Sequence, residues 1–213
     1  MINRILIKIK VKYPLTKLDV GEMQSLKARG MRFTISAYHA EGLGHVSVMS
    51  AVGFFGLMKM DTVIVNPTEI DLPLYSYDRI YAMGNDVLIT ELYDTLAGEW
   101  SDEELNAVKD KYADVAERDP GEHWYDGIKL SSSISKKGKK KQGERMDALA
   151  MDHLAVYLEK GAPVSNSGLK MEKAKSYVDG LIAQGGPSTD VFKKALGEEK
   201  TRELFYDVLF GVC

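Results

Sequence analysis

The chain has 213 residues, of which 45% are hydrophobic and 28% are charged, and its 28 Lys and Arg against 31 Asp and Glu give a formal net charge of −3. This composition is typical of a globular protein with a sizeable core, and it gives no overall attraction to nucleic acid or to an anionic membrane, so either partner would need a local patch. The single cysteine, Cys213, excludes an intramolecular disulfide framework and any thiolate site for zinc or an iron–sulfur cluster within one chain.

The N-terminal segment, from Met1 to Tyr13, alternates isoleucine and valine with lysine. The lysines interrupt the apolar core that an export signal needs, and no later stretch offers the roughly 18 uncharged apolar residues of a transmembrane span. We therefore expect a cytoplasmic protein with no membrane partner, in a reducing compartment as the cysteine count also suggests. A short helix is predicted next over Leu18–Arg29, ended by Gly30.

Five strands are predicted after this helix, because β-branched and aromatic residues recur in short runs bounded by Gly, Pro and Asn. The strands are Met31–His39, Gly44–Val52, Lys59–Val65, Leu74–Met83 and Asp86–Tyr93. The connections between them are too short to contain crossover helices. The sheet is therefore predicted to be a largely antiparallel meander.

The second half of the chain, from about residue 95, carries Ala, Lys, Glu and Leu at helical spacing. Ser101 and Glu104 predict a capping box for a helix that continues to Pro120. The further predicted helices are Glu144–Lys160, Leu169–Ala183, a helix capped by Ser188 and closed by Gly197, and Glu198–Phe210. Strands first and helices later indicate one α+β domain over residues 1–213, strand-rich in 1–95 and helix-rich in 96–213.

The histidines give no local metal signature, because His39, His45, His123 and His153 are scattered along the chain. His153 lies on the apolar face of a predicted helix, and we interpret it as a core histidine. His39 and His45 flank a predicted hairpin turn and are interpreted as hairpin surface. No nucleotide-binding loop and no nucleophile motif is present either, so we expect no bound metal and no bound nucleotide.

The sharpest charge feature is a low-complexity segment, Ser131–Lys141, which reads SSSISKKGKKK. Its lysines are Lys136, Lys137, Lys139, Lys140 and Lys141. One interpretation is a mobile, solvated loop. The other is a docking patch for an acidic partner or an anionic ligand. Nucleic acid is not favoured, because no aromatic residues interleave with the lysines.

The segment Asp71–Asp78 reads DLPLYSYD and is chemically dense. Its proline suits the entrance of a strand, where a missing N–H is tolerated. Alternation along the strand places Leu74, Ser76 and Asp78 on one face and Tyr75, Tyr77 and Arg79 on the other. Asp78 is then either a structural carboxylate, hydrogen-bonded or ion-paired, or a proton donor whose pKa is raised by partial burial. The pattern leaves both hypotheses open.

Three stretches together resemble the ferredoxin-dependent bilin reductase superfamily, which includes red chlorophyll catabolite reductase. They are Asp71–Ile80 (DLPLYSYDRI), Val87–Asp94 (VLITELYD) and Val191–Phe210 (VFKKALGEEKTRELFYDVLF). Their order and spacing agree with the family pattern, and the block Glu122–Lys160 is similar in place to the family's Trp-containing loop and helix. The resemblance implies an α/β/α sandwich, in which a central, mostly antiparallel sheet is flanked by helices.

The resemblance also implies a function. An open-chain tetrapyrrole such as biliverdin would bind between the sheet and the C-terminal helices. No redox cofactor would be bound, because electrons would arrive singly from ferredoxin or flavodoxin while the protein supplies protons. The motif match places Asp78 at the family's catalytic aspartate, with Glu91 as a candidate helper. The residues expected to contact the substrate are Thr62, Tyr75, Ser76 and Tyr77.

Two departures from the family pattern affect these expectations. Where some members carry a histidine before the D-L-P motif, this chain has Asp61 and Thr62, and where many carry an Asn or Asp near the C-terminal motif, it has Gly185 or Gly186. Two alternatives therefore stay open: a non-catalytic tetrapyrrole-binding or carrier protein on the same fold, and an unrelated α+β binding module. Ferredoxin and flavodoxin are acidic, so the resemblance favours the docking interpretation of the lysine segment.

Overall fold

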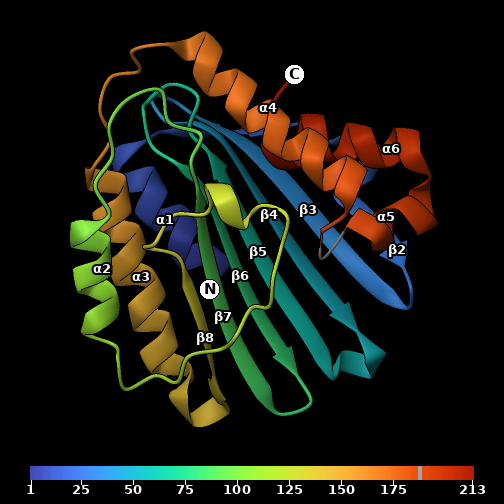
Figure 1. Cartoon of the computed structure of the whole chain (residues 1–213). Helices are drawn as coiled ribbons and strands as arrows, with labels where there is room; N and C mark the ends of the chain where they lie inside the picture. Colours follow the sequence, from blue (N-terminus) through green and yellow to red (C-terminus); the bar gives the residue numbers. More distant parts are fainter. Residues whose placement is uncertain (187–188) are drawn as a thin grey trace.

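The computed structural model describes residues 1–186 and 189–213, and it arranges them in three layers around one sheet (Figure 1). The sheet has eight strands in the order β1-β3-β4-β5-β6-β7-β8, with β2 also paired to β3, and every pair is antiparallel. The strands are β1 (Leu15–Leu18), β2 (Ser25–Ala28), β3 (Met31–Ala40), β4 (Gly44–Gly53), β5 (Met58–Asn66), β6 (Leu74–Ala82), β7 (Asn85–Tyr93) and β8 (Ile134–Lys139). The predicted α+β sandwich with a mostly antiparallel sheet is thus confirmed.

Helices cover both faces of the sheet (Figure 1). One face, here called the α3 face, is covered by α1 (Ile2–Lys12), α2 (Glu103–Asp110) and α3 (Gly143–Glu159). The other, the α4 face, is covered by α4 (Ser167–Gln184), α5 (Thr189–Leu196), α6 (Glu198–Glu203) and the π-helical segment η5 (Leu204–Phe210). Short 3₁₀ turns occur at η1 (Gly21–Gln24), η2 (Phe54–Gly56), η3 (Asp126–Ile128) and η4 (Lys140–Gln142). None of the helices in the described ranges has both the length and the apolarity needed to span a bilayer.

The alternation predicted for β6 is observed, and it decides which side chains reach which layer. Tyr75 and Tyr77 are fully buried in the hydrophobic cluster of the α3 face. Leu74 is buried in the cluster of the α4 face, and Ser76 and Asp78 line a cavity on that side. Neighbouring residues of a single strand therefore contribute to two separate cores.

The helix predicted over Leu18–Arg29 is wrong. The segment instead forms the end of β1, the turn η1 and the strand β2, and both strands pair with the outer edge of β3. Gly21 has a φ of 51°, and its N–H donates to Asp19 Oδ1 at 2.9 Å. This left-handed turn breaks the helical path, and the edge of β3 supplies backbone partners that the local pattern does not reveal.

Two expectations for the second half of the chain also need correction. The segment Ser131–Lys141, for which a mobile loop is one of two interpretations, contains the strand β8, which pairs with β7 from Thr90↔Ile134 to Asn85↔Lys139. The predicted capping box is absent: α2 begins at Glu103, its N-cap makes no side-chain hydrogen bond, and it ends at Asp110 rather than near Pro120. The helices predicted over 144–160, 169–183 and 198–210 are present, and Ser188, the predicted cap of α5, lies outside the described residues.

Candidate functional site

A cavity opens on the α4 face between the sheet and the C-terminal helices. It contains about 930 Å³ of empty space, solvent at its mouth included. Residues of β4 to β7 form its floor, and residues of α4, α5, η5 and the loop 118–125 form its roof. The polar side chains on the floor come from three neighbouring strands, and they are Thr62, Ser76, Asp78 and Glu91.

Asp78 lies in the middle of β6, half-buried, between Thr62 of β5 and Ile89 of β7. Thr62 Oγ1 donates a hydrogen bond to Asp78 Oδ1 at 2.5 Å. Burial raises the pKa of Asp78 to about 6; the Thr62 hydrogen bond opposes the rise, and the charge of Glu91 adds to it. A carboxyl group with this pKa gains and loses a proton near neutral pH, as a general acid must.

Glu91 lies on β7 beside Ser76, its register partner on β6. Tyr93 Oη donates a hydrogen bond to Glu91 Oε2 at 2.6 Å, and Lys129 Nζ lies 3.8 Å from Glu91 Oε1. A hydroxyl and an ammonium group thus hold the Glu91 carboxyl group in place beside Ser76. The charge of Glu91 raises the pKa of Asp78, because it makes a second negative charge nearby unfavourable.

Aromatic side chains line the cavity from a strand, a loop and a helix. Tyr93 of β7 packs against Tyr177 of α4 with ring centroids 4.3 Å apart, and it meets Tyr125 edge-on at 5.5 Å. His123 stacks on Tyr125 at 4.8 Å. Methionine, isoleucine and leucine side chains complete an apolar lining. Such a lining suits a flat, conjugated molecule.

The roof formed by η5 is tied to the sheet by side chains of β4 and β5. His45 Nε2 lies 2.9 Å from the Val208 carbonyl, Ser47 Oγ donates to the Leu209 carbonyl at 2.7 Å, and Asn66 Nδ2 donates to the Phe210 carbonyl at 2.7 Å. These three bonds satisfy carbonyls at the C-terminal end of the helix that lack an intrahelical partner. His45 thus holds the cavity wall in place rather than forming a hairpin surface, and burial lowers its pKa.

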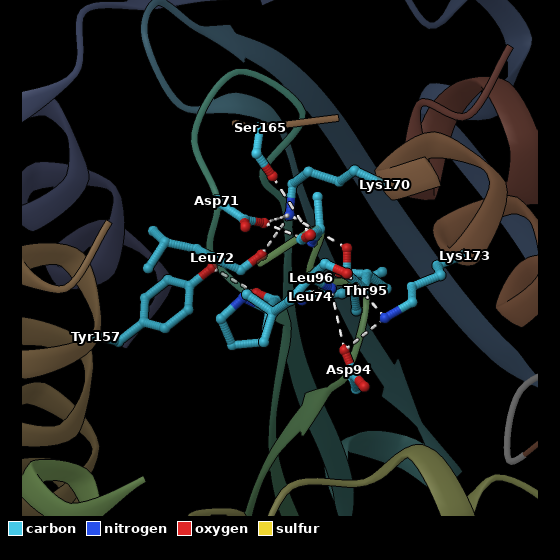
Figure 2. Close-up of polar contacts among 12 residues, drawn as sticks. Asp71, Leu72, Leu74, Asp94, Thr95, Leu96, Tyr157, Ser165, Lys170 and Lys173 are labelled. Atoms are coloured by element: carbon cyan, nitrogen blue, oxygen red, sulfur yellow. Dashed lines mark hydrogen bonds and ion pairs between the residues drawn. The ribbon is translucent and has the colours of Figure 1, made fainter. Parts of the chain in front are cut away.

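A buried lysine fixes the start of the DLPLYSYD motif (Figure 2). Lys170 of α4 donates to the Leu72 carbonyl at 2.6 Å and lies 3.3 Å from Asp71 Oδ1, and all three residues are buried. Asp71 Oδ1 also accepts the Ala97 N–H at 3.0 Å. The motif's first aspartate therefore joins α4 to the loops before β6 and after β7, and it fixes where β6 enters the site. The sequence gives one signal of this, a lone lysine on the apolar face of α4.

Four of the predicted site residues lie together on the cavity floor: Thr62, Ser76, Asp78 and Glu91. Tyr75 and Tyr77 do not join them, because they point into the α3 face and are fully buried there. The aromatic lining comes instead from Tyr93, Tyr125, Tyr177, Phe205 and Phe210.

Residues on the cavity roof were not identified from the sequence. Arg118, His123 and Thr189 line the cavity, and their chain segments carry no motif that would single them out. Gly186, one of the two glycines at the family's Asn/Asp position, also lines it, whereas the Gly185 carbonyl accepts a hydrogen bond from Trp124 Nε1 at 2.9 Å. Close to Gly186, Thr189 Oγ1 is buried and has no hydrogen-bond partner among residues 1–186 and 189–213.

The lysine segment divides into a buried and an exposed part. Lys136 is buried, paired with Glu117, and donates to the Val115 carbonyl at 3.1 Å. Lys137, Lys139 and Lys141 are exposed. The side chain of Lys140 lies outside the described part of the structure. Lys136 is thus a structural ion pair between β8 and the loop after α2, which removes it from any docking surface.

His153 is a core histidine, as predicted: it is fully buried, and its Nε2 lies 3.0 Å from the Ser132 carbonyl. His39 is exposed, 3.4 Å from Glu69. Within the ranges the structure describes, no three His, Cys, Asp or Glu side chains are grouped so that they could hold a metal ion.

No family model matches the chain, and no curated protein matches it in sequence. Among solved structures, it is similar to phytochromobilin synthase from tomato in complex with biliverdin, with a TM-score of 0.76 and 11% sequence identity, over 99% of this chain and 82% of that one. At this identity the likeness shows the fold. It confirms the fold that the resemblance to the bilin reductase superfamily implies.

Proposed function

We propose that the chain binds an open-chain tetrapyrrole of the biliverdin type in the cavity and reduces it, with Asp78 as the proton donor and ferredoxin or flavodoxin as the source of electrons. The observation that carries the proposal is a half-buried carboxyl group, with its pKa raised to about 6, at the floor of an apolar, tyrosine-lined cavity. Few structural roles explain such a group, because it makes no ion pair among the described residues.

The proton chemistry follows from the contacts of Asp78. The Thr62 hydroxyl holds one carboxyl oxygen, which leaves the other to carry the proton towards the ligand. A tetrapyrrole in the cavity would displace water and raise the pKa of Asp78 further. Reducing one double bond of the ligand consumes two electrons, delivered one at a time by the donor, and two protons. Asp78 gives one of these protons to the ligand radical and is then reprotonated from solvent.

The electron donor would dock electrostatically, since ferredoxin and flavodoxin are acidic. The exposed lysines of β8 and η4, Lys137, Lys139 and Lys141, remain available for this contact. Loss of the buried Lys136 from the patch predicts a weaker, though still salt-sensitive, attraction. On this proposal the chain carries no redox cofactor of its own.

A non-catalytic tetrapyrrole-binding protein is the second candidate, and Gly186 is the observation that favours it. This glycine lines the cavity in the region where reductases often have an Asn or Asp. Without a polar side chain at this position the cavity has one route fewer for protons, while the apolar lining that would bind a tetrapyrrole is kept.

An anaerobic titration with biliverdin, followed by reduced ferredoxin, separates the two candidates. Both predict a shifted visible spectrum on mixing, and a spectrum that stays unchanged would contradict both for this ligand. Only a reductase predicts a further change of the bound band when reduced ferredoxin is added.

The role of Asp78 is tested by Asp78→Asn, which we expect to bind biliverdin normally and to lose turnover by about a hundredfold or more. The matched control is Asp61→Asn. Asp61 lies on the next strand but faces away from the cavity, where it accepts a hydrogen bond from Ser50 Oγ at 2.8 Å. Turnover retained in Asp78→Asn, or lost equally in Asp61→Asn, would refute Asp78 as the proton donor.

A further inference from the structure

Three hairpin turns lie at one end of the sheet, and we call them together the turn edge. They are Arg29-Gly30 between β2 and β3, Phe54–Leu57 between β4 and β5, and Met83-Gly84 between β6 and β7. The pairings Met31↔Gly53 and Met58↔Ala82 bring them side by side. Figure 1 shows the β4–β5 and β6–β7 turns together at the lower end of the sheet.

The turn edge holds the strained backbone of the molecule. Throughout residues 1–186 and 189–213, the non-glycine residues with positive φ are Arg29 (48°), Phe54 (50°), Phe55 (56°) and Met83 (51°), and all four belong to these turns. Two-residue hairpin turns with both φ values positive favour Asn-Gly or Asp-Gly. Arg, Phe and Met are unfavourable there. Strain concentrated in this way points to a use for the side chains it presents.

The apolar side chains of the turn edge project into solvent. Phe54 is 58% exposed, Phe55 110%, Leu57 73% and Met83 92%. Phe55 is therefore fully open to solvent. A cluster of large apolar side chains on exposed turns is uncommon and marks an interaction surface.

Cations lie beside Phe55 and on the strands that lead to these turns. Lys27, Arg29 and Arg32 line the same shallow groove as Phe55, and Lys59 lies between Val52 and Tyr81 on neighbouring strands. All four cations are exposed. None of them forms an ion pair with any residue in the described ranges. Their charge is therefore available to an anionic partner.

We propose that the turn edge docks on an anionic lipid bilayer, with Phe54, Phe55, Leu57 and Met83 inserted among the lipids and the cations against the headgroups. Apolar tips backed by lysine and arginine are the arrangement that binds membrane interfaces. The tips project as separate fingers from different turns, and a fluid bilayer can close around each of them. A protein partner would need a matching pocket for every finger, because interface anchors are surrounded by packed contacts.

The net charge of −3 does not oppose this docking. It excludes a global attraction to a membrane, but the turn edge is a local patch of the kind such binding requires. The proposal involves neither the cavity nor Asp78, so it does not depend on the proposed function.

Co-sedimentation of the full chain with vesicles tests the proposal. We expect binding to phosphatidylcholine vesicles that contain phosphatidylserine, weaker binding to pure phosphatidylcholine, and loss of binding as salt rises. The double substitution Phe54→Asn with Phe55→Asn should lower the partition coefficient by about tenfold or more, because two apolar anchors are removed. Arg29→Asn should lower it by about fivefold, as expected for one cation at an anionic surface.

These substitutions cannot lose binding simply by unfolding the chain, because asparagine is better suited than Phe or Arg to positive φ. We expect the thermal midpoint of each variant to be unchanged or raised. The matched control is Val11→Asn, which removes an 82% exposed valine near the end of α1. The chain passes from there into β1 beside Ala40, at the opposite end of β3 from the turn edge. The vesicle binding of Val11→Asn should equal that of the parent chain.

The proposal is overturned if the parent chain does not bind phosphatidylserine vesicles, or if Val11→Asn weakens binding as much as the Phe54 and Phe55 substitutions do. It is also overturned if those two substitutions abolish self-association or the capture of an acidic protein while vesicle binding persists. Loss of self-association would indicate that a second copy of the chain occupies the turn edge. Loss of the capture of an acidic protein would indicate that such a protein occupies it.

Discussion

Strand β6 presents Tyr75, Tyr77 and Arg79 to the α3 face and Ser76 and Asp78 to the α4 face, so one strand allows the two faces to be compared directly. On the α3 face, the buried charged groups have partners of opposite charge: Arg79 is enclosed with Asp86, and the buried Lys136 is paired with Glu117 at the surface. On the α4 face, Asp78 has a hydroxyl as its partner and an open cavity beside it.

The comparison separates groups that are buried for stability from groups that are buried for chemistry. A buried charge with a matched counter-charge has little freedom to change its protonation state. A half-buried carboxyl group without a counter-charge can titrate near neutral pH, and its burial lowers the stability of the fold. The α3 face therefore holds the sheet together, and the α4 face is available for a ligand.

The largest effect is expected for the charge pair on the α3 face. Arg79 and Asp86 are fully enclosed, with Nε 2.6 Å from Oδ1 and Nη2 donating to Oδ2 at 2.8 Å. Arg79→Met leaves a buried carboxylate without its partner, so it should lower the free energy of unfolding by about 3–5 kcal/mol. Urea unfolding at pH 7 measures the change.

The control for this prediction is the double variant Arg79→Met with Asp86→Val, which removes both charges and should recover most of the loss. If Arg79→Met unfolds no more easily than the parent chain, or if the double variant is as unstable as the single one, the pair does not stabilise the α3 face as described.

A smaller effect, with opposite signs on the two faces, is expected from pH. The pKa of Asp78 is raised to about 6, so its contribution to stability is present at low pH and is lost as pH rises through about 4 to 6. Burial lowers the pKa of His153, on the α3 face, to about 4. The contribution of His153 is therefore present above the usual histidine pKa of 6.5 and is lost as pH falls towards 4.

The variant Asp78→Asn measures the contribution of Asp78 separately from that of His153. Relative to the parent chain, its free energy of unfolding should increase between pH 4 and pH 7, by about 1–3 kcal/mol at the upper end. Urea unfolding across this range measures the difference, and NMR of the His153 ring should show it neutral down to about pH 4. A difference independent of pH would mean that Asp78 does not titrate in this window.

The sequence predicts the five central strands, β3 to β7, well, and it predicts the outer strands and the roof of the cavity poorly. The physical reason is the range of the interactions. Alternation along 74–82 is a local pattern, and it placed Ser76 and Asp78 on one face correctly. The lysine-rich run 136–141 carries no local sign that β7 offers it an edge, so its strand was missed. Tyr177 and Thr189 reach the cavity because α4 and α5 fold back over the sheet, and no short-range pattern records that return.

The smallest effect is expected when a tyrosine is replaced by phenylalanine, once on each face of the sheet. Tyr77 is fully buried on the α3 face, and its hydroxyl has no hydrogen-bond partner within the described residues. Tyr77→Phe removes an unsatisfied polar group and should raise the free energy of unfolding by about 1 kcal/mol. Tyr93 lines the cavity and donates to Glu91 at 2.6 Å. Tyr93→Phe removes this hydrogen bond to Glu91 and should lower the free energy of unfolding by about 1–2 kcal/mol.

Ligand binding gives the same pair of variants a second readout. Biliverdin titration should give the parent affinity for Tyr77→Phe, because that ring lies behind the sheet from the cavity, and a changed affinity for Tyr93→Phe. Equal signs in the two unfolding experiments, or weaker biliverdin binding in Tyr77→Phe, would show that the two faces are not separate. A ring on the α3 face is separated from a ligand on the α4 face by the sheet. Weaker biliverdin binding in Tyr77→Phe would therefore favour the expectation that Tyr77 contacts the substrate over its buried position on the α3 face.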